Sequence, residues 1–242
     1  MTDTLLPPCM LFAAGRGSRL QPLTDKTPKP LIDVGGSRLI DRLLAQLAAA
    51  KVPRTVVNVH HLGSQILDHL AARANALAPM TVHGIEEPQL LETGAGLLNA
   101  RALLASDPVW TLNGDVLLEL PLDRFPRRLS ASEDLHLLLV PTPSHRAAGD
   151  FNARAGRVTE RGDRYVFAGL SLLSMTALAT FAAGLEKQSG DPFSLQGFLF
   201  DRVQAGRVGA TIHSGSWYDI GTPEQLEAAR QALKAAAKGS RF

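Results

Sequence analysis

At 242 residues, the chain is long enough to fold as one large α/β domain or as two small ones. Its 25 lysine and arginine residues against 23 aspartate and glutamate residues are spread along the chain, which argues against a nucleic-acid-binding protein. The single cysteine, Cys9, excludes an internal disulfide and a zinc site built from cysteines alone.

The amino-terminal residues, MTDTLLPPCM, lack the basic start and the apolar core of a secretory signal. No apolar run approaches the roughly 18 residues that cross a bilayer. We therefore expect a cytoplasmic protein with neither nucleic-acid nor membrane partners.

Strands and helices alternate in the first half of the chain. An apolar run at 9–14 predicts a buried strand, and leucines at helical spacing predict a helix over 37–51. This alternation predicts an α/β fold with a Rossmann-like, mostly parallel central sheet and helices on both faces, which binds ligands at the carboxyl ends of its strands. The further elements expected are a strand at 55–61, a helix at 63–75, a strand at 80–87, a helix at 94–105 and a strand at 108–116.

The pattern changes after residue 135. Turn signals at Gly156 and at Arg161-Gly162, between β-prone runs, predict a hairpin over 156–173. Thr222 is the expected N-cap of a final helix because Pro223 and Glu224 occupy its first turn. The remaining predictions are a strand at 135–143, helices at 175–183 and 195–204, and a strand at 208–213.

The stretch AAGRGSRLQPLTDKTPKPL, residues 13–31, raises the question of a phosphate-binding loop. It is not a dinucleotide fingerprint, because Leu20 stands at the third glycine position and prolines interrupt the helix that should follow. It is not a P-loop either, because Ser18 and Arg19 follow Gly17 where that motif has Lys-Ser/Thr. What remains is a glycine turn whose backbone amides approach phosphate oxygens.

Three cations accompany this turn. The guanidinium groups of Arg16 and Arg19 suit phosphate geometry, and Lys29 lies on a backbone stiffened by Pro28 and Pro30. A surface loop with solvated basic residues is the alternative interpretation.

The same stretch closely resembles the signature of the sugar-1-phosphate nucleotidyltransferases: Gly-x-Gly-Ser/Thr-Arg-Leu, then Pro-Leu-Thr, then Pro-Lys-Pro-Leu. The resemblance covers almost the whole chain, because four later motifs follow in the family's order. They are LETGAG at 91–96, NGD at 113–115, GDF at 149–151 and WYDIGTPEQL at 217–226. The implied fold is that of the nucleotidyltransferases, with a small sugar-binding β subregion.

The resemblance implies that Arg16, Arg19 and Lys29 contact the reacting phosphates. It also implies that two aspartates, Asp115 and Asp219, hold Mg²⁺, which neutralises crowded phosphate oxygens. The implied nucleotide-binding residues are Ala13, Ala14, Gly15, Gly17 and Gly94. Glu86 and Glu92 are weaker candidates for polar contact with the base, and solvated loop residues are the alternative interpretation for both.

On the sugar side, the resemblance points to Asn113, Gly149 and Asp150, the last able to accept hydrogen bonds from sugar hydroxyls. The chain lacks a mid-chain Glu-Lys-Pro motif and a repeat domain, so within the family it looks most like the N-acetylmuramate 1-phosphate uridylyltransferases of peptidoglycan recycling. The carboxylate of such a sugar requires a cation, and Arg146 or Arg154 beside GDF are the candidates.

The resulting expectation is an enzyme that joins a sugar 1-phosphate to a nucleoside triphosphate, UTP above all, and releases pyrophosphate. Two alternatives stay open: a mannose- or glucose-1-phosphate enzyme with another base, and a non-catalytic regulatory subunit that binds nucleotide sugars. We expect one domain over 1–242, with a nucleotide-binding part at about 8–135, a sugar-binding part at about 136–221 and a carboxyl-terminal helix at 222–242. The oligomeric state expected is a monomer or a small homo-oligomer.

Overall fold

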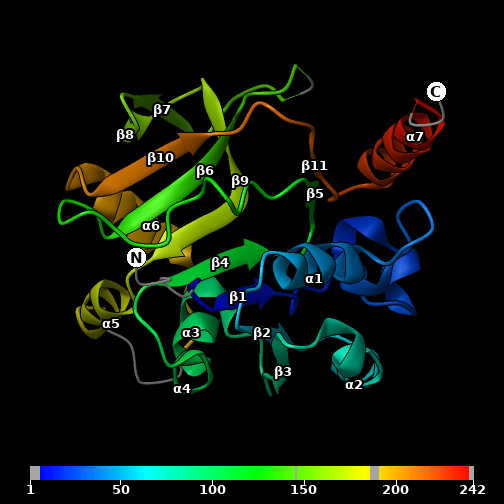
Figure 1. Ribbon diagram of the computed structural model, residues 1–242. Coiled ribbons are helices and arrows are strands. Elements are labelled where there is room, and N and C mark those ends of the chain that lie inside the picture. Colours follow the sequence, from blue (N-terminus) through cyan, green and yellow to red (C-terminus); the bar gives the residue numbers. More distant parts are fainter. Residues whose placement is uncertain (1–5, 145, 186–190, 240–242) are drawn as a thin grey trace.

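A computed structural model describes residues 6–144, 146–185 and 191–239 (Figure 1). A nine-stranded sheet runs through it in the order β3-β2-β1-β4-β9-β6-β10-β8-β7, and β5 and β11 pair separately. The strands are β1 (Cys9–Phe12), β2 (Arg54–Val59), β3 (Thr81–Glu86), β4 (Val109–Asn113), β5 (Val116–Leu118), β6 (Leu135–Pro141), β7 (Phe151–Arg154), β8 (Arg157–Arg161), β9 (Tyr165–Leu173), β10 (Val208–Ile212) and β11 (Trp217–Asp219).

Seven α-helices accompany the strands in the described residues. They are α1 (Leu39–Ala49), α2 (Gly63–Arg73), α3 (Glu92–Asn99), α4 (Arg101–Leu104), α5 (Met175–Ala183), α6 (Leu195–Gln204) and α7 (Pro223–Gly239). The hydroxyl of Thr222 accepts a hydrogen bond from the amide of Gln225 at 3.3 Å, so the predicted cap of the last helix is confirmed.

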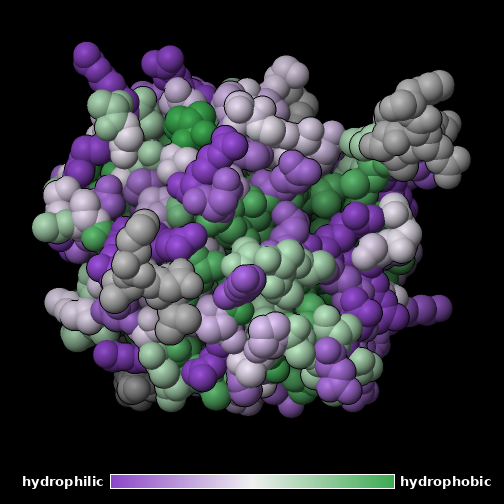
Figure 2. Space-filling model, viewed as in Figure 1, coloured by the Kyte–Doolittle hydropathy of each residue, from purple (hydrophilic) through white to green (hydrophobic). Residues whose placement is uncertain are grey.

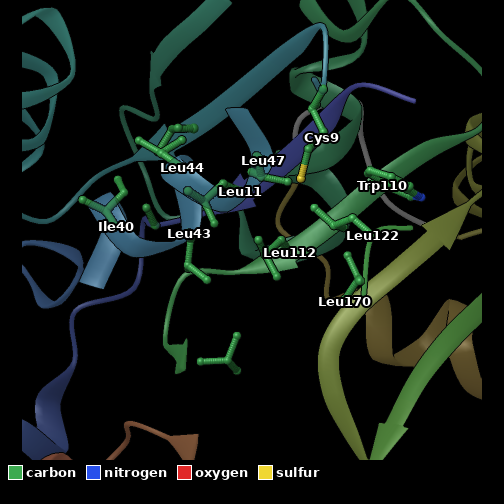
Figure 3. Packing of buried hydrophobic residues seen from close by; sticks show 14 of the residues in the cluster. Cys9, Leu11, Ile40, Leu43, Leu44, Leu47, Trp110, Leu112, Leu122 and Leu170 are labelled. Carbon is green, nitrogen blue, oxygen red and sulfur yellow. The ribbon is translucent and has the colours of Figure 1, made fainter. Parts of the chain in front are cut away.

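The parallel half of the sheet is built around β1, which lies between β2 and β4. Successive residues of β1 point to opposite faces: Leu11 packs into the cluster that α1 and α2 cover, and Met10 into the cluster on the other face. Figure 3 shows Cys9 and Leu11 packed with the leucines of α1. Helices therefore cover both faces of this parallel half of the sheet, as predicted.

The second half of the sheet is mixed. Strand β9 runs antiparallel between β4 and β6, whereas β10 runs parallel to β6. Strand β7 pairs with β8 and, through Phe151 and Tyr165, also with β9, so the far edge of the sheet folds back toward its middle. Helix α6 packs against this half through Phe198, which is fully buried.

Three predictions differ from the structure. The predicted hairpin over 156–173 is wrong in its pairing: β8 pairs with the preceding β7 and with β10, and β9 pairs with β4 and β6. The strand expected at 108–116 is interrupted at Gly114, whose amide donates to the carbonyl of Phe12 across the sheet. The helix expected at 94–105 begins at Glu92 and is divided at Ala100.

No helix in the described residues is long and apolar enough to span a membrane. Figure 2 shows hydrophilic and hydrophobic residues interspersed over the face seen in Figure 1.

Candidate active site

A cavity of about 440 Å³, called the main cavity below, opens where β1 and β4 end. Carboxyl ends of neighbouring parallel strands meet at one edge of the sheet, which is where the sequence places the ligand. Further wall residues are Phe12, Asn58, Leu90, Thr93 and Gly221. The predicted site residues on its wall are Ala13, Ala14, Gly15, Gly17, Arg19, Lys29, Asn113 and Asp115, together with Glu92.

The glycine turn presents free backbone donors to this cavity. Among the described residues, none accepts a hydrogen bond from the amides of Gly15, Arg16, Gly17 or Ser18. Gly17 has φ +68°, in the left-handed region that favours glycine, and its carbonyl accepts a hydrogen bond from the Thr24 hydroxyl at 3.0 Å. Several free amides in such a turn form a cradle for anions such as phosphate.

Lys29 reaches across this cradle to the opposite wall. Its Nζ lies 2.8 Å from Oδ2 of Asp115, which follows the NG pair at the end of β4. The guanidinium of Arg19 lies beside Gly221, because a side chain added at that glycine would meet Arg19 Nη2 at 2.9 Å. Two of the three predicted cations, Arg19 and Lys29, therefore line the cavity.

The pairing of β5 with β11 brings Asp219 to the same place. Asp219 is opposite Val116, and the amide of the next residue, Ile220, donates to the carbonyl of Asp115 at 2.8 Å. Burial raises the pKa of the Asp219 carboxyl, and the charge of Asp115 raises it further, whereas the cations Lys29, Arg19 and Arg146 oppose that shift. Two carboxylates and several cations thus converge from segments far apart in sequence.

Asp115 and Asp219 fit a magnesium site by the chemistry of their donors. Mg²⁺ prefers oxygen ligands and is commonly held by one or two carboxylates together with substrate phosphates. A cation between them would relieve the repulsion from Asp115 that, after burial, contributes to the raised Asp219 pKa. No larger group of histidine, cysteine, aspartate or glutamate suited to a metal occurs in the part of the chain that the structure describes.

A glycine is required at position 114, between Asn113 and Asp115, because the backbone at the end of β4 lies very close to the backbone of Phe12. A Cβ at this position would lie 2.4 Å from the carbonyl oxygen of Phe12. Since real Cβ atoms do not come so near, only glycine lets the end of β4 lie against the end of β1. This contact sets the position of Asp115 relative to the glycine turn.

A buried polar network supports the loop from below. Asn58 Oδ1 accepts a hydrogen bond from the amide of Ala13 at 2.9 Å, and Asn58 Nδ2 donates to Oε1 of Glu87 at 2.8 Å. Glu87 is 1% exposed, and its Oε2 accepts from the amide of Leu91. Sequence reasoning missed both side chains, although a polar residue within the apolar run TVVNV is an unusual feature of a buried strand.

Glu86, the neighbour of Glu87, does not reach the cavity. It is exposed at the end of the edge strand β3, one residue from the buried Glu87. Because side chains alternate along a strand, an error of one position exchanges the buried face for the solvent face.

Two other predicted residues also lie off the wall. Arg16 is exposed on the glycine turn, away from the cavity surface. Gly94 is buried, and its amide donates to the carbonyl of Phe193 at 2.8 Å, so that amide is occupied. A Cβ at Gly94 would meet the Phe193 ring at 2.3 Å, which explains the glycine by protein packing.

A second cavity of about 290 Å³, called the second cavity below, lies between the sheet and α6. It shares Phe12, Thr93 and Asn113 with the main cavity. Asp150 lies on its wall, and the Oδ2 atom of this residue accepts a hydrogen bond from the amide of Phe167 at 2.9 Å. Arg161 also lines it, which the sequence did not indicate as a site residue.

The other predicted sugar-side residues, Arg146, Gly149 and Arg154, lie close to Asp150 in the sequence. Arg146 Nη2 lies 3.7 Å from Asp150 Oδ1, and its positive charge also opposes the rise of the Asp219 pKa. A Cβ at Gly149 would lie 2.5 Å from Thr142 Oγ1, which explains that glycine. Arg154 is exposed at the turn between β7 and β8.

Residues 9–236 match the family model described as nucleotidyl transferase. The chain is 34% identical over 240 residues to an N-acetylmuramate alpha-1-phosphate uridylyltransferase of Neisseria meningitidis serogroup B, covering 95% of this chain and 99% of that protein. A protein of the same description from Caulobacter vibrioides is 34% identical, with 93% and 96% covered. The solved structure of HddC from Yersinia pseudotuberculosis with GMP-PN superposes with a TM-score of 0.76 at 22% identity, covering 94% of this chain and all of that one.

Proposed function

Because this chain belongs to the nucleotidyl transferase family, we propose that it joins UTP to N-acetylmuramate 1-phosphate, forming the UDP-sugar and releasing pyrophosphate. The observation that carries the choice of substrates is the 34% identity to two uridylyltransferases of that description over nearly the full length of each. The two adjoining cavities support a two-substrate reaction, since each is large enough for part of a nucleotide sugar.

We assign the nucleotide to the main cavity and the sugar to the second. In this proposal the triphosphate lies on the free amides of the glycine turn, with Arg19 and Lys29 on its flanks. Asn113 faces both substrates because it lines both cavities, and Asp150 accepts hydrogen bonds from sugar hydroxyls. In this proposal, the nucleotide-binding part is at about 8–135 and the sugar-binding part at about 136–221, and both contribute strands to the nine-stranded sheet.

The chemical step needs positioning more than a protein base. The second pKa of a phosphate is about 6, so the attacking sugar phosphate is largely a dianion at neutral pH. An oxygen of this phosphate attacks the α-phosphorus, and the bond to the leaving pyrophosphate breaks. Lys29 stabilises the charge at the reacting phosphates, and Arg19 that of the pyrophosphate.

Asp115 and Asp219 are the residues that would hold Mg²⁺, which supplies neutralisation of the phosphate oxygens when bound. In the free protein Lys29 forms an ion pair with Asp115, so this lysine keeps the carboxylate oriented toward the cavity. The same ammonium is thereby held beside the place where the phosphates meet.

The experiment is a matrix of pyrophosphate release. UTP, GTP, CTP and dTTP are each combined with the 1-phosphates of N-acetylmuramate, N-acetylglucosamine, mannose and glucose, with Mg²⁺. The highest kcat/KM is expected for UTP with N-acetylmuramate 1-phosphate, and Asp115→Asn is expected to lower it by a thousandfold or more.

A preference for mannose or glucose 1-phosphate with another base would contradict the proposed substrates and keep the reaction. Absence of release in every combination, with nucleotide sugars still bound, would contradict catalysis and favour a regulatory binding protein. The substitution Asp123→Asn is the matched control, because Asp123 is an exposed loop residue beside Arg124.

A further inference from the structure

Arg161 places an unpaired guanidinium at the rim of the second cavity. Its Cζ atom lies 4.5 Å from the centre of the Phe200 ring of α6. Among the described residues no carboxylate pairs with it, and none accepts a hydrogen bond from its side chain. Arg202 and Arg207, by contrast, are both paired with Asp134.

Strand pairing determines where this arginine lies. Arg161, the last residue of β8, is directly opposite Phe151, which follows Asp150. The amide of Gly162 donates to the carbonyl of Asp150 at 3.2 Å, so the end of β8 is tied to the GDF turn. The side chain of Asp150 does not neutralise Arg161, since its oxygens face the Phe167 amide and Arg146.

Arg161 is the one cation on the wall of the second cavity in the part of the chain that the structure describes. In the floor, the hydroxyls of Thr111 and Ser171 bond to each other at 2.5 Å, and the neighbouring wall residues are leucine and phenylalanine. A guanidinium stacked on an aromatic ring keeps its N–H edges free, and these edges match the two oxygens of a carboxylate. Among the described wall residues, Arg161 is therefore the one cation: Asn113 and Gln196 are neutral amides, and Asp150 already faces the Phe167 amide and Arg146.

We infer that Arg161 binds the carboxylate of an acidic substituent on the sugar substrate and so sets the enzyme's preference for an acidic over a neutral sugar phosphate. The inference rests on the proposed function, which supplies a sugar bearing a carboxylate. It replaces the expectation for Arg146 and Arg154. Arg146 is engaged with Asp150, and Arg154 is exposed at a turn that lines neither cavity.

The experiment compares kcat/KM for N-acetylmuramate 1-phosphate and N-acetylglucosamine 1-phosphate, which differ by the acidic substituent, with UTP and Mg²⁺. In Arg161→Met the ratio of the two values is expected to fall by about tenfold to one hundredfold, the range of one charged hydrogen-bonded contact. Arg161→Lys keeps a point charge without the planar fork, so an intermediate ratio is expected. Arg154→Met, the matched control on the same hairpin, is expected to leave the ratio unchanged.

The wild-type ratio and the variant ratio test different statements. If the wild-type enzyme prefers the neutral sugar, both the proposed substrate and this inference are overturned. If the wild-type enzyme prefers the acidic sugar and Arg161→Met keeps the full preference, the inference alone is overturned. An equal loss with both sugars in Arg161→Met also overturns it, because it shows a role unrelated to the carboxylate. Binding of UTP to each variant, measured by calorimetry, verifies that the main cavity is intact.

Discussion

The ammonium of Lys29 lies 2.8 Å from Oδ2 of Asp115, although 86 positions separate the two residues in the chain. Lys29 follows the glycine turn, Asp115 follows β4, and both line the main cavity, so the contact joins two parts of its wall. The lysine and the aspartate are thereby hydrogen-bonded to each other. Phosphoryl transfer uses cations to stabilise phosphate charge and carboxylates to hold metal ions.

Replacing Lys29 by methionine is expected to lower kcat by about one hundredfold or more, because a preorganised positive charge is lost where charge develops. Pyrophosphate release under saturating substrates measures the effect. Lys26→Met is the control, since Lys26 is an exposed lysine of the same loop. If Lys29→Met retains activity within threefold of the wild type, this lysine has no part in the reaction.

Adding one methyl group at Gly114 is expected to lower kcat/KM by about one hundredfold, because a displacement of about 1 Å at a reacting site has that order of effect. The cause is the 2.4 Å approach of the new Cβ to the Phe12 carbonyl oxygen. The control is Gly197→Ala in α6, where the nearest atom is 3.5 Å away. That change is expected to raise the free energy of unfolding by about 0.5–1 kcal/mol through helix propensity. Near-normal activity of Gly114→Ala would show that the strand ends are free to separate.

Truncating Asn58 to alanine is expected to lower the free energy of unfolding by about 2–4 kcal/mol and to raise the KM for UTP. The reason is that the amide of Ala13 and the carboxylate of Glu87 both lose their buried partner. Urea unfolding and initial-rate kinetics measure the two effects. Asn152→Ala serves for comparison, since Asn152 bonds to Glu160 at the surface, and a change of under about 0.5 kcal/mol is expected. Equal behaviour of the two variants would contradict a supporting role for the network.

The lowered pKa of the Asp134 carboxyl leads us to expect that the free energy of unfolding depends on pH. Hydrogen bonds from Arg207, opposed by burial and reinforced by Arg202, hold the pKa of its carboxyl below the usual value. A lowered pKa in the folded protein gives stability that is fully present above the unfolded value, about 3.9, and is lost as the pH falls through the folded pKa.

Asp134→Asn is therefore expected to cost about 1 kcal/mol at pH 7, a value reduced by solvent screening, and to cost progressively less as the pH falls below the unfolded pKa of about 3.9. Chemical denaturation of both proteins between pH 2.5 and pH 7 measures this difference. The exposed Asp123→Asn variant is expected to show no such trend. A penalty of equal size at pH 3 and pH 7 would contradict a role for the charge.

The central features of the site were predictable from the sequence because they depend on near neighbours. Glycines and prolines around Arg19 and Lys29 restrict the backbone locally, and the apolar runs before residues 13 and 113 are typical of buried parallel strands. A strand end in such a sheet is a binding position, so Asp115 followed from the same pattern. The family resemblance added Asp219, which no local pattern connects to the loop.

Other features depended on pairings between distant segments, which leave little trace in local periodicity. The β5–β11 pair brings Asp219 to Asp115. At the end of β3, Glu86 is exposed, whereas the next residue, Glu87, is buried. The partnering of β8 with β7 and β10 puts Arg161 at the second cavity.

The sequence by itself thus determined the class of fold and the glycine turn with its cations, because both follow from hydrophobic pattern and backbone restriction within a short window. The roles proposed for the charged residues came from the family resemblance. Only the tertiary structure decided which charged side chains face the two cavities: Lys29 pairs with Asp115, Arg16 stays at the surface, and Arg161 reaches the rim. The physical reason is that strand register and helix packing, which are properties of the whole chain, select the face on which each side chain lies.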